Sequence, residues 1–489
     1  MATEKVHIAI DLGATSGRVI AGKINDGKLV LEEVHRFPNA VMQINGKFYW
    51  NIYSLFNEIR EGLRKAGKLG SIDSIGVDTW GVDFAFVAPD DSLIGLPRAY
   101  RDPYTDKAMK AYLDIIPKET VYGKTGIQFL TFNSVFQLYA LSQEKSFALQ
   151  NAKNLLFIPD AITYLLTGKR VCEYTILSTG QLLNVKEGKV DADLLAPSGV
   201  KPELFPELVM PGTKVGTLSP WLAEELEIPQ VPVVAVAGHD TASAVAAVPA
   251  ENENFAYLSS GTWSLIGIES PHPIISKESL ADNFTNEGGV FGTTRFLKNI
   301  TGMWLLEQCR KEWTKAGKDY SYPQLVEMAM AGNPFKAVID PDDPGFANPR
   351  SMTRAIAEYC AAHKMDAPAN DSEIVRCIFE SLALKYRFVL ERLKKYSPHP
   401  ISCLHVIGGG SKNALLNQFT ANAIGMPVIA GPSEATACGN VLLQAYACGE
   451  VADLAEMRRI VAHSSELDTF TPEASDRWEE AYSKNYNAK

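Results

Sequence analysis

Cysteine is scarce and scattered in this chain of 489 residues. Its seven cysteines include no CxxC pair and follow no regular spacing. An odd, scattered set is typical of reduced core thiols and provides no disulfide framework. The sequence also shows no cluster of His and Cys with metal-ligand spacing. We therefore expect a cytoplasmic protein whose cysteines are structural.

Excess basic charge and long apolar runs are lacking as well. The 47 Lys and Arg residues against 57 Asp and Glu give a net charge of −10, without a basic stripe. Nucleic acid and anionic membranes are therefore not expected partners. The apolar start is broken by Asp11, and no other apolar run reaches the length of a membrane span. An anionic substrate would have to be bound by locally placed donors.

Two common catalytic signatures are missing too: the GxxxxGK[ST] phosphate loop and a nucleophile–base triad. What is present is an ordinary globular composition, with 46% hydrophobic residues, in a chain too long for a single core. We expect two large domains, 1–248 and 249–489. The boundary is placed where an Ala/Val-rich helix gives way to a segment rich in Pro, Glu and Asn.

The most informative stretch surrounds Asp240. The β-branched run from Val231 to Val236 predicts a buried strand, and the alanine-rich sequence from Thr241 to Ala247 predicts a helix. Asp240 would then lie at a helix N-terminus, where backbone N–H groups converge. A carboxylate there can accept a proton from a hydroxyl or help to hold a metal on a phosphate. Alternatively, it only caps the helix, a contribution of about 1 kcal/mol.

Two predicted hairpins have turns of Gly, Ser and Thr. The first turn, Asp11-Leu-Gly-Ala-Thr-Ser-Gly-Arg18, joins strands over 6–10 and 19–24, and the second lies within 254–267. Glycine amides and hydroxyls in such turns can bind an anion, and a strand-end Asp suits a hydrated Mg²⁺. A simple hairpin turn is the alternative in each case. Their recurrence at about half the chain's length suggests a duplicated fold.

Other segments give weaker signals. Gly81 interrupts two apolar strands within 74–87 and is either a bulge or a close approach of backbone to a small ligand. The Thr/Ser-rich segment 172–184 predicts strands facing a cleft, 197–232 predicts irregular structure, and 286–289 predicts a turn.

Towards the C-terminus, the periodicity predicts a long amphipathic helix over 371–396, capped by Asp371 or Ser372. A strand from Cys403 runs into glycines at 408–410, where a flat base or a phosphate could lie on bare backbone.

Four motifs together resemble those of the FGGY carbohydrate kinases, in the order of that family and over nearly the whole chain. They are Asp11-Leu-Gly-Ala-Thr-Ser-Gly-Arg18, Gly238-His-Asp-Thr-Ala-Ser243, Ser260-Gly-Thr262 and Gly408-Gly-Gly-Ser-Lys-Asn413. The resemblance implies an α/β fold of two actin-like, ribonuclease-H-like ATPase domains, with ATP and sugar in the interdomain cleft.

Within the family, three segments are most similar to the members that act on L-rhamnulose: Gly76-Val-Asp-Thr-Trp-Gly-Val-Asp83, Gly238-His-Asp-Thr241 and Leu297-Lys-Asn-Ile300. The implied reaction is transfer of the γ-phosphoryl group of Mg-ATP to O1 of that ketose, in L-rhamnose catabolism. The alternatives are another ketose, such as L-fuculose or xylulose, and a non-kinase actin-like ATPase. The implied partner is a small-molecule ketose, and the protein would be a monomer or a homodimer.

The resemblance also implies roles, position by position. Asp240 would be the catalytic base, and Asp11 and Asp240 would hold Mg²⁺ through water. In many members a Thr stands where this chain has Ala14, which leaves open which side chain contacts the γ-phosphate. The residues implied to face ATP are Ala14, Thr15, Ser16, Gly17, Arg18, Thr262, Glu307 and Gly409, and those implied to face the sugar are Gly81, His239, Asp240, Thr241 and Asn299.

Overall fold

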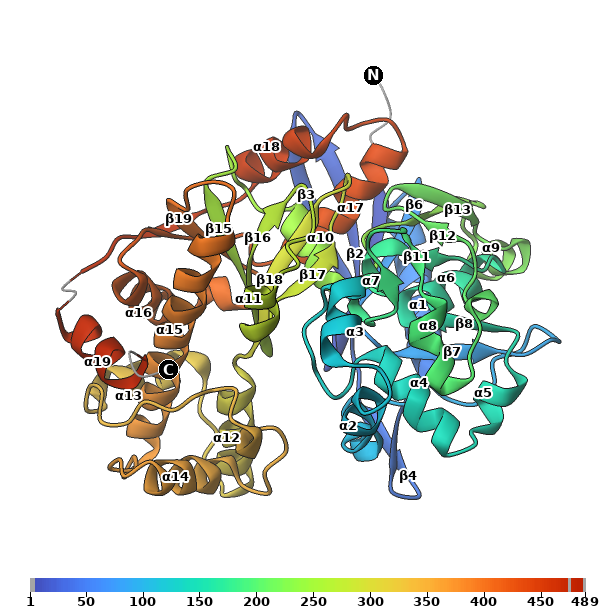
Figure 1. The fold of residues 1–489 in the computed structure, drawn as a ribbon. Coiled ribbons are helices and arrows are strands. Elements are labelled where there is room, and N and C mark those ends of the chain that lie inside the picture. Colours follow the sequence, from blue (N-terminus) through green and yellow to red (C-terminus); the bar gives the residue numbers. More distant parts are fainter. Residues whose placement is uncertain (1–4, 474–475, 487–489) are drawn as a thin grey trace. The chain divides into compact units, whose positions relative to one another are not determined.

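The structure, a computed structural model, describes residues 5–473 and 476–486 and forms two compact units (Figure 1). Unit 1 combines Met1–Glu251 with Glu269–Phe296 and Ala435–Ser465. Unit 2 combines Asn252–Ile268, Leu297–Glu434 and Glu466–Lys489. Neither unit is a single continuous stretch of chain, because segments from the second half complete unit 1.

A six-stranded sheet forms the centre of unit 1, in the order β13-β14-β6-β1-β2-β3. β14, β6 and β1 are parallel, whereas β1, β2 and β3 form an antiparallel meander. Every residue of β1 and β6 is buried, as expected for strands that are covered on both faces. The strands span β1 (His7–Leu12), β2 (Ser16–Asn25), β3 (Lys28–Pro38), β6 (Ser74–Thr79), β13 (Thr213–Thr217) and β14 (Pro232–Ala235).

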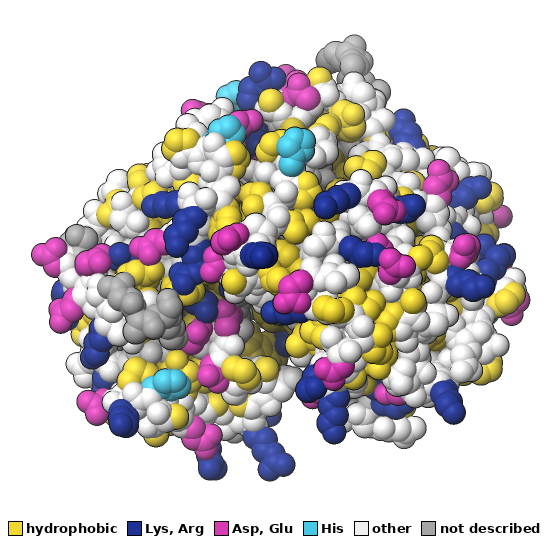
Figure 2. Space-filling model, in the orientation of Figure 1, with side chains coloured by type: hydrophobic (Ala, Val, Ile, Leu, Met, Phe, Trp, Pro, Cys, Tyr) yellow, Lys and Arg dark blue, Asp and Glu magenta, His cyan; other side chains and the backbone are white. Residues whose placement is uncertain are grey.

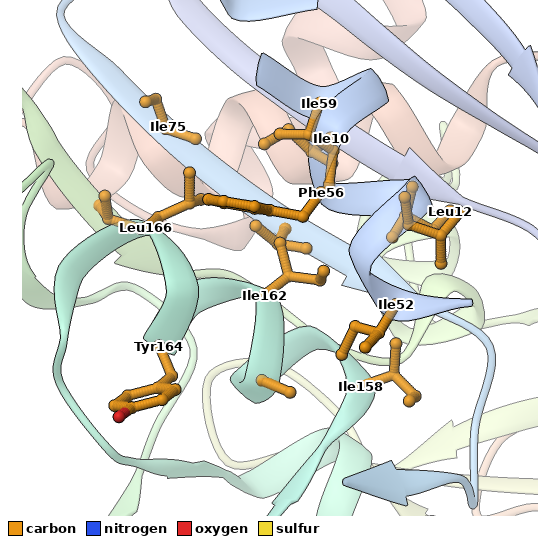
Figure 3. Close-up of a cluster of buried hydrophobic side chains, with 14 of the residues drawn as sticks. Ile10, Leu12, Ile52, Phe56, Ile59, Ile75, Ile158, Ile162, Tyr164 and Leu166 are labelled. Carbon is orange, nitrogen blue, oxygen red and sulfur yellow. The ribbon is translucent and has the colours of Figure 1, made fainter. Parts of the chain in front are cut away.

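One face of this sheet packs on α1 (Ile52–Leu69) and α6 (Ile158–Thr167). Figure 3 shows Ile10 and Leu12 of β1 with Phe56 and Ile162 of these helices in one apolar cluster. Side chains alternate along a strand, so the intervening residues face the opposite side, where α10 (Asp240–Ala246) and α17 (Ala435–Ala447) lie against the sheet. Ser74 and Asp78 of β6 therefore face this side, where they hydrogen-bond with Gln444 and Asn440 of α17.

A second apolar cluster of unit 1 surrounds the small sheet of β7 (Phe84–Val87) and β8 (Asn154–Phe157) together with α4 (Ser134–Gln143). The remaining elements of unit 1 are β4 (Val41–Ile44), β5 (Lys47–Trp50), α2 (Ala108–Leu113), α3 (Lys118–Thr125), α5 (Phe147–Asn151), β9 (Cys172–Glu173), α7 (Tyr174–Thr179), β10 (Leu183–Asn184), β11 (Lys189–Val190), α8 (Ala192–Leu195), β12 (Leu208–Val209), α9 (Pro220–Leu226), α11 (Lys277–Ala281), β17 (Thr285–Gly288) and α18 (Leu454–Ser464).

The sheet of unit 2 repeats this strand arrangement, which confirms the predicted duplication. β15 and β16 form a hairpin, and β15 pairs in parallel with β19, just as β1 pairs with β2 and β6. Its strands follow the order β17-β18-β16-β15-β19-β20-β21, and β17 and the start of β18, up to Phe296, are assigned to unit 1. The strands not yet given are β15 (Phe255–Ser260), β16 (Trp263–Ser270), β18 (Thr294–Thr301), β19 (Cys403–Ile407), β20 (Val428–Ala430) and β21 (Asp468–Phe470). Its helices are α12 (Trp304–Lys315), α13 (Tyr322–Ala331), α14 (Met352–Ala362), α15 (Asp371–Tyr396), α16 (Ala414–Ile424) and α19 (Asp476–Tyr486).

Four local predictions were wrong. Residues 172–184 contain helix α7, because Glu173 caps it by accepting from the backbone N–H groups of Thr175 and Ile176. The predicted turn at 286–289 lies mostly in strand β17, which is buried. The segment 197–232 includes β13 and α9, and the N-cap of α15 is Asn370, one residue earlier than predicted.

Charged side chains of both signs are interspersed on the face drawn in Figure 2. Within the described ranges 5–473 and 476–486, no helix combines the length and the apolar character that crossing a membrane requires.

Candidate active site

Three parallel strands of unit 1 end at one edge of the sheet and bring polar residues together there. The register of β1 and β6 sets Asp11 opposite Asp78. Thr79 bridges to His239, and its N–H donates to the carbonyl of Gly238 at 2.9 Å. Ligands of α/β proteins bind at the carboxyl ends of parallel strands. This edge, which continues into Asp240, is therefore the candidate site of unit 1.

The carboxylates at this edge interact strongly. Burial raises the pKa of Asp78 well above its usual range, and the charge of Asp11 raises it further. The amide of Asn440 opposes this by donating to Asp78 Oδ2 at 2.5 Å. Arg18, opposite Asp11 in the hairpin register, donates to Asp11 Oδ2 at 2.5 Å. A group of acidic side chains with one nearby guanidinium is an environment that favours a cation.

Asp240 is the first residue of α10, and the N-cap residue of this helix is His239. Asp240 is therefore not the N-cap residue, as the alternative of a purely capping role would require. Asp240 Oδ1 accepts from the N–H of Thr241 at 2.6 Å, while 31% of the Asp240 side chain stays exposed. Desolvation raises the pKa of Asp240, and the hydrogen bond from the Thr241 N–H offsets part of this effect. The carboxylate is thus held at the helix start and still accessible to a ligand.

The turn between β1 and β2 is closed by its own backbone. Gly13 N–H donates to Ser16 O at 2.9 Å, and the side-chain amide of Asn39 donates to Gly13 O at 2.8 Å. Thr15 is exposed at the tip, while Ala14, Ser16 and Arg18 are half-buried. Gly17 has a packing reason of its own, because a Cβ there would lie 2.3 Å from the ring of Phe37.

Gly81 marks a crossing between two sheets of unit 1, since β6 belongs to the central sheet and β7 pairs with β8. A Cβ on Gly81 would lie 3.2 Å from Thr179 Oγ1, so the space is tight. The next residue, Val82, has a φ of 68°, which is strained for a β-branched side chain. Thr179 and Ser134 hold it through hydrogen bonds to its N–H and carbonyl, at 3.2 and 2.6 Å. Such strain is common next to functional sites.

Asp83 anchors this crossing as a buried carboxylate. Its Oδ2 accepts from the indoles of Trp50 and Trp80, at 2.6 and 3.1 Å, and from the Tyr100 N–H at 3.1 Å. Gln137 donates to Oδ1 at 3.0 Å. Burial nevertheless raises the pKa of Asp83 to about 6, because these hydrogen bonds offset only part of the desolvation.

A raised pKa makes the stability of unit 1 depend on pH. The folded protein holds the Asp83 proton more tightly than the unfolded chain, whose pKa is near 3.8. The protonated Asp83 therefore stabilises the folded state fully below about pH 3.8, and this stabilisation is lost as the pH rises through about 6. The whole loss in the free energy of unfolding is about 3 kcal/mol. We expect the stability advantage of wild type over Asp83→Asn to shrink between pH 4 and 7 by about that amount. Urea unfolding of both proteins across this range measures it, and a constant or growing difference would contradict the assignment.

In unit 2, the β15–β16 hairpin and the glycine-rich turn after β19 lie side by side. A Cβ on Gly410 would lie 2.0 Å from Ser260 Oγ, and Gly408 has a φ of 80° beside the Ser260 carbonyl. The carbonyl of Thr262 accepts from the N–H groups of Gly302 and Trp304, both at 3.2 Å. The turn containing Thr262 is therefore fixed against the start of α12.

The other three residues of unit 2 that the resemblance implies for the site are Gly409, Asn299 and Glu307. Gly409 is exposed, and a Cβ there would meet no atom within 4 Å. Asn299 is half-buried on β18. Glu307 on α12 accepts from the Tyr322 hydroxyl at 2.5 Å and from Arg310 at 3.3 Å. Its carboxylate thus already has partners within unit 2.

The implied site residues are divided between the two units. Unit 1 holds residues 11, 14–18, 81 and 239–241, and unit 2 holds residues 262, 299, 307 and 409. Sequence reasoning missed Glu287 and Arg295, which lie beside His239. The available signal was Arg295 itself, a charged residue directly before the apolar pair Phe296 and Leu297.

Comparison with known proteins defines the class. Residues 6–247 match the N-terminal domain of the FGGY family of carbohydrate kinases, and residues 256–448 match its C-terminal domain. The chain belongs to this family and is a carbohydrate kinase, which confirms the resemblance seen in the sequence.

Among curated relatives, a rhamnulokinase of Bacteroides thetaiotaomicron is 54% identical over 475 residues, covering 97% of each chain. A rhamnulokinase of Bacillus subtilis is 41% identical over 473 residues, covering 96% of each chain. Among solved structures, a xylulose kinase of Lactobacillus acidophilus has a TM-score of 0.82 at 18% identity, covering 99% of this chain and 97% of that one. At that identity the likeness supports the fold alone, and it agrees with the predicted two-domain kinase architecture.

Proposed function

We propose that this enzyme transfers the γ-phosphoryl group of ATP to O1 of L-rhamnulose, giving L-rhamnulose 1-phosphate and ADP in L-rhamnose catabolism in the cytoplasm. The observation that supports it most is the 54% identity to a rhamnulokinase over nearly the full chain. The acidic strand edge of unit 1 supports it further, because it offers in Asp240 a carboxylate that can accept a proton.

In the proposed mechanism, Asp240 accepts the proton of the attacking hydroxyl. Its carboxylate is accessible and fixed by the Thr241 N–H, so it can be oriented before the sugar arrives. Gly81, His239, Thr241 and Asn299 face the sugar in this proposal. Residues 14–18, Thr262, Glu307 and Gly409 face ATP, with residues 1–248 carrying the sugar and the base and 249–489 the nucleotide.

Magnesium is the metal proposed for the reaction, since it neutralises charge on the transferring phosphates. Within the described ranges, no group of three or more His, Cys, Asp and Glu side chains could hold a metal directly. Mg²⁺ commonly keeps several waters and uses one or two carboxylates together with substrate phosphates. Asp11 and Asp240, whose charges interact, fit that way of binding.

A sugar screen tests the proposed substrate. ATP consumption by the purified protein is measured with L-rhamnulose, L-fuculose, xylulose and glycerol, in the presence of Mg²⁺. We expect kcat/KM to be highest for L-rhamnulose by at least about tenfold, because a site built to hydrogen-bond a hydroxyl rejects a misplaced one. A higher kcat/KM for L-fuculose or xylulose would show that this ketose, and not L-rhamnulose, is the substrate. ATP hydrolysis independent of any sugar would favour a non-kinase ATPase.

Adjacent glycines test the proposed nucleotide contact of unit 2. Gly409→Ala adds a methyl group to open space, so the fold should be unchanged, whereas bound nucleotide would be crowded. We expect the KM for ATP to rise about tenfold with the sugar KM unchanged. Gly410→Ala is the matched variant: its Cβ collides with Ser260, so it should lower thermal stability. An unchanged KM for ATP in Gly409→Ala would remove this residue from the nucleotide site.

A further inference from the structure

His239 is held from behind by two buried residues of opposite charge. Arg295, on β18, is fully buried, and its Nη2 lies 3.2 Å from His239 Nδ1. Glu287, on β17, places Oε2 3.1 Å from the same Nη2 and 3.2 Å from His239 Nδ1. Arg295 is itself fixed by donation from Nε to the carbonyl of Gly288 at 2.9 Å. All four residues belong to unit 1.

This arrangement favours one tautomer of His239. A guanidinium can only donate hydrogen bonds, so in its 3.2 Å contact with Arg295 Nη2 the Nδ1 atom of His239 accepts with its lone pair. With Nδ1 accepting, the ring N–H lies on Nε2. Glu287 balances the guanidinium charge next to the ring.

The opposite ring nitrogen is directed towards the catalytic carboxylate. His239 Nε2 lies 3.5 Å from Asp240 Oδ1, which is too long for a good hydrogen bond. A hydroxyl bound between the two groups could accept from Nε2–H and donate to Asp240 at the same time.

We propose that Arg295, charge-balanced by Glu287, is a positioning residue that holds His239 in its Nε2–H form, so that His239 donates to the sugar hydroxyl whose proton Asp240 accepts. This inference rests on the proposed sugar kinase function. Arg295 and Glu287, which would orient His239, both lie outside the motif Gly238-His-Asp-Thr-Ala-Ser243.

The energetic cost of Arg295 supports a functional role. Its Nη1 is buried, and among the described residues no atom accepts a hydrogen bond from it. A buried donor without an acceptor costs about 1–3 kcal/mol. Apolar replacement of a buried ion pair is often neutral or stabilising, so packing alone gives no reason for this pair.

A double-mutant cycle tests whether Arg295 acts through His239. Arg295→Lys keeps the positive charge beside Glu287 but loses the planar fork that contacts both Gly288 and His239. We expect it to lower kcat/KM for the sugar about tenfold with the ATP KM unchanged, and by less than about twofold in a His239→Asn background. Equal losses in both backgrounds would overturn the proposal. The matched control is Arg376→Lys, which alters a partly buried pair with Glu380 on α15 and should leave the sugar kinetics unchanged.

The tautomer can be measured without substrate or turnover. In protein labelled with ¹⁵N-histidine, the chain's eight histidines give separate ring signals, and loss of one set in His239→Asn assigns residue 239. We expect a protonated Nε2 and an unprotonated Nδ1 in wild type. A proton on Nδ1 would overturn the inference even if Arg295→Lys failed to fold. Absence of activity on every ketose would instead contradict the proposed function. The ring signals do not depend on activity, so they test the tautomer of His239 separately from the proposed function.

Discussion

Asp240→Asn is expected to abolish sugar phosphorylation almost completely while nucleotide affinity is largely kept. Asn preserves the shape of the side chain and can still accept from the Thr241 N–H. It cannot accept the proton of the attacking hydroxyl, so a loss in kcat of about 10²- to 10⁴-fold is expected. Single-turnover phosphorylation of L-rhamnulose and equilibrium binding of an ATP analogue measure the two effects separately.

The alternative role of Asp240 in helix stability has its own control. Glu278 is an exposed acidic residue in the first turn of α11 in the same unit. Glu278→Gln removes a first-turn charge as Asp240→Asn does, and each should leave the melting temperature nearly unchanged. Full kinase activity in Asp240→Asn would remove this residue from the mechanism. A large loss of thermal stability in that variant would point instead to a structural role.

Gly439→Ala is expected to have the largest effect on stability. A Cβ at this position would lie 1.8 Å from the backbone carbonyl oxygen of Ser243, where α17 crosses α10. Because backbone cannot rotate away as a side chain can, the two helices must separate, at a cost of about 1–3 kcal/mol or more. We expect the melting temperature to fall by about 5 °C or more. Activity should fall as well, since α10 begins with Asp240 and the next residue of α17, Asn440, binds Asp78.

The same substitution in another helix supplies the comparison. Gly123 lies within α3, and a Cβ there would meet no atom within 4 Å. Gly123→Ala should therefore stabilise the protein by about 0.5–1 kcal/mol, because alanine loses less conformational freedom than glycine in a helix. Differential scanning calorimetry of both variants should give shifts of opposite sign. A neutral Gly439→Ala would show that the helix crossing is looser than the structure describes.

The sequence predicted the elements whose signals are local. The hairpin after Asp11, the strand and helix flanking Asp240 and the helix over 371–396 all depend on periodicity and turn chemistry within a few residues. The four family motifs, which occur in the order of the FGGY family, also indicated the fold and the enzyme class.

What the sequence could not predict depends on contacts between distant residues. The segment 286–289 has turn composition, yet it forms a buried strand because Gly288 donates to Ser178 and its own carbonyl accepts from Arg295. The link from Asn440 to Asp78 spans 362 positions and has no local signal. The residues around His239 were missed for the same reason.

The late arrival of α17 in the chain has a consequence for biosynthesis. Asn440 and Gln444 on this helix bind Asp78 and the carbonyl of Ile8, on strands translated hundreds of residues earlier. A nascent chain therefore holds the acidic edge of its first sheet without these partners until α17 has been translated. Premature termination anywhere before α17 should yield a polypeptide that depends on chaperones or is degraded.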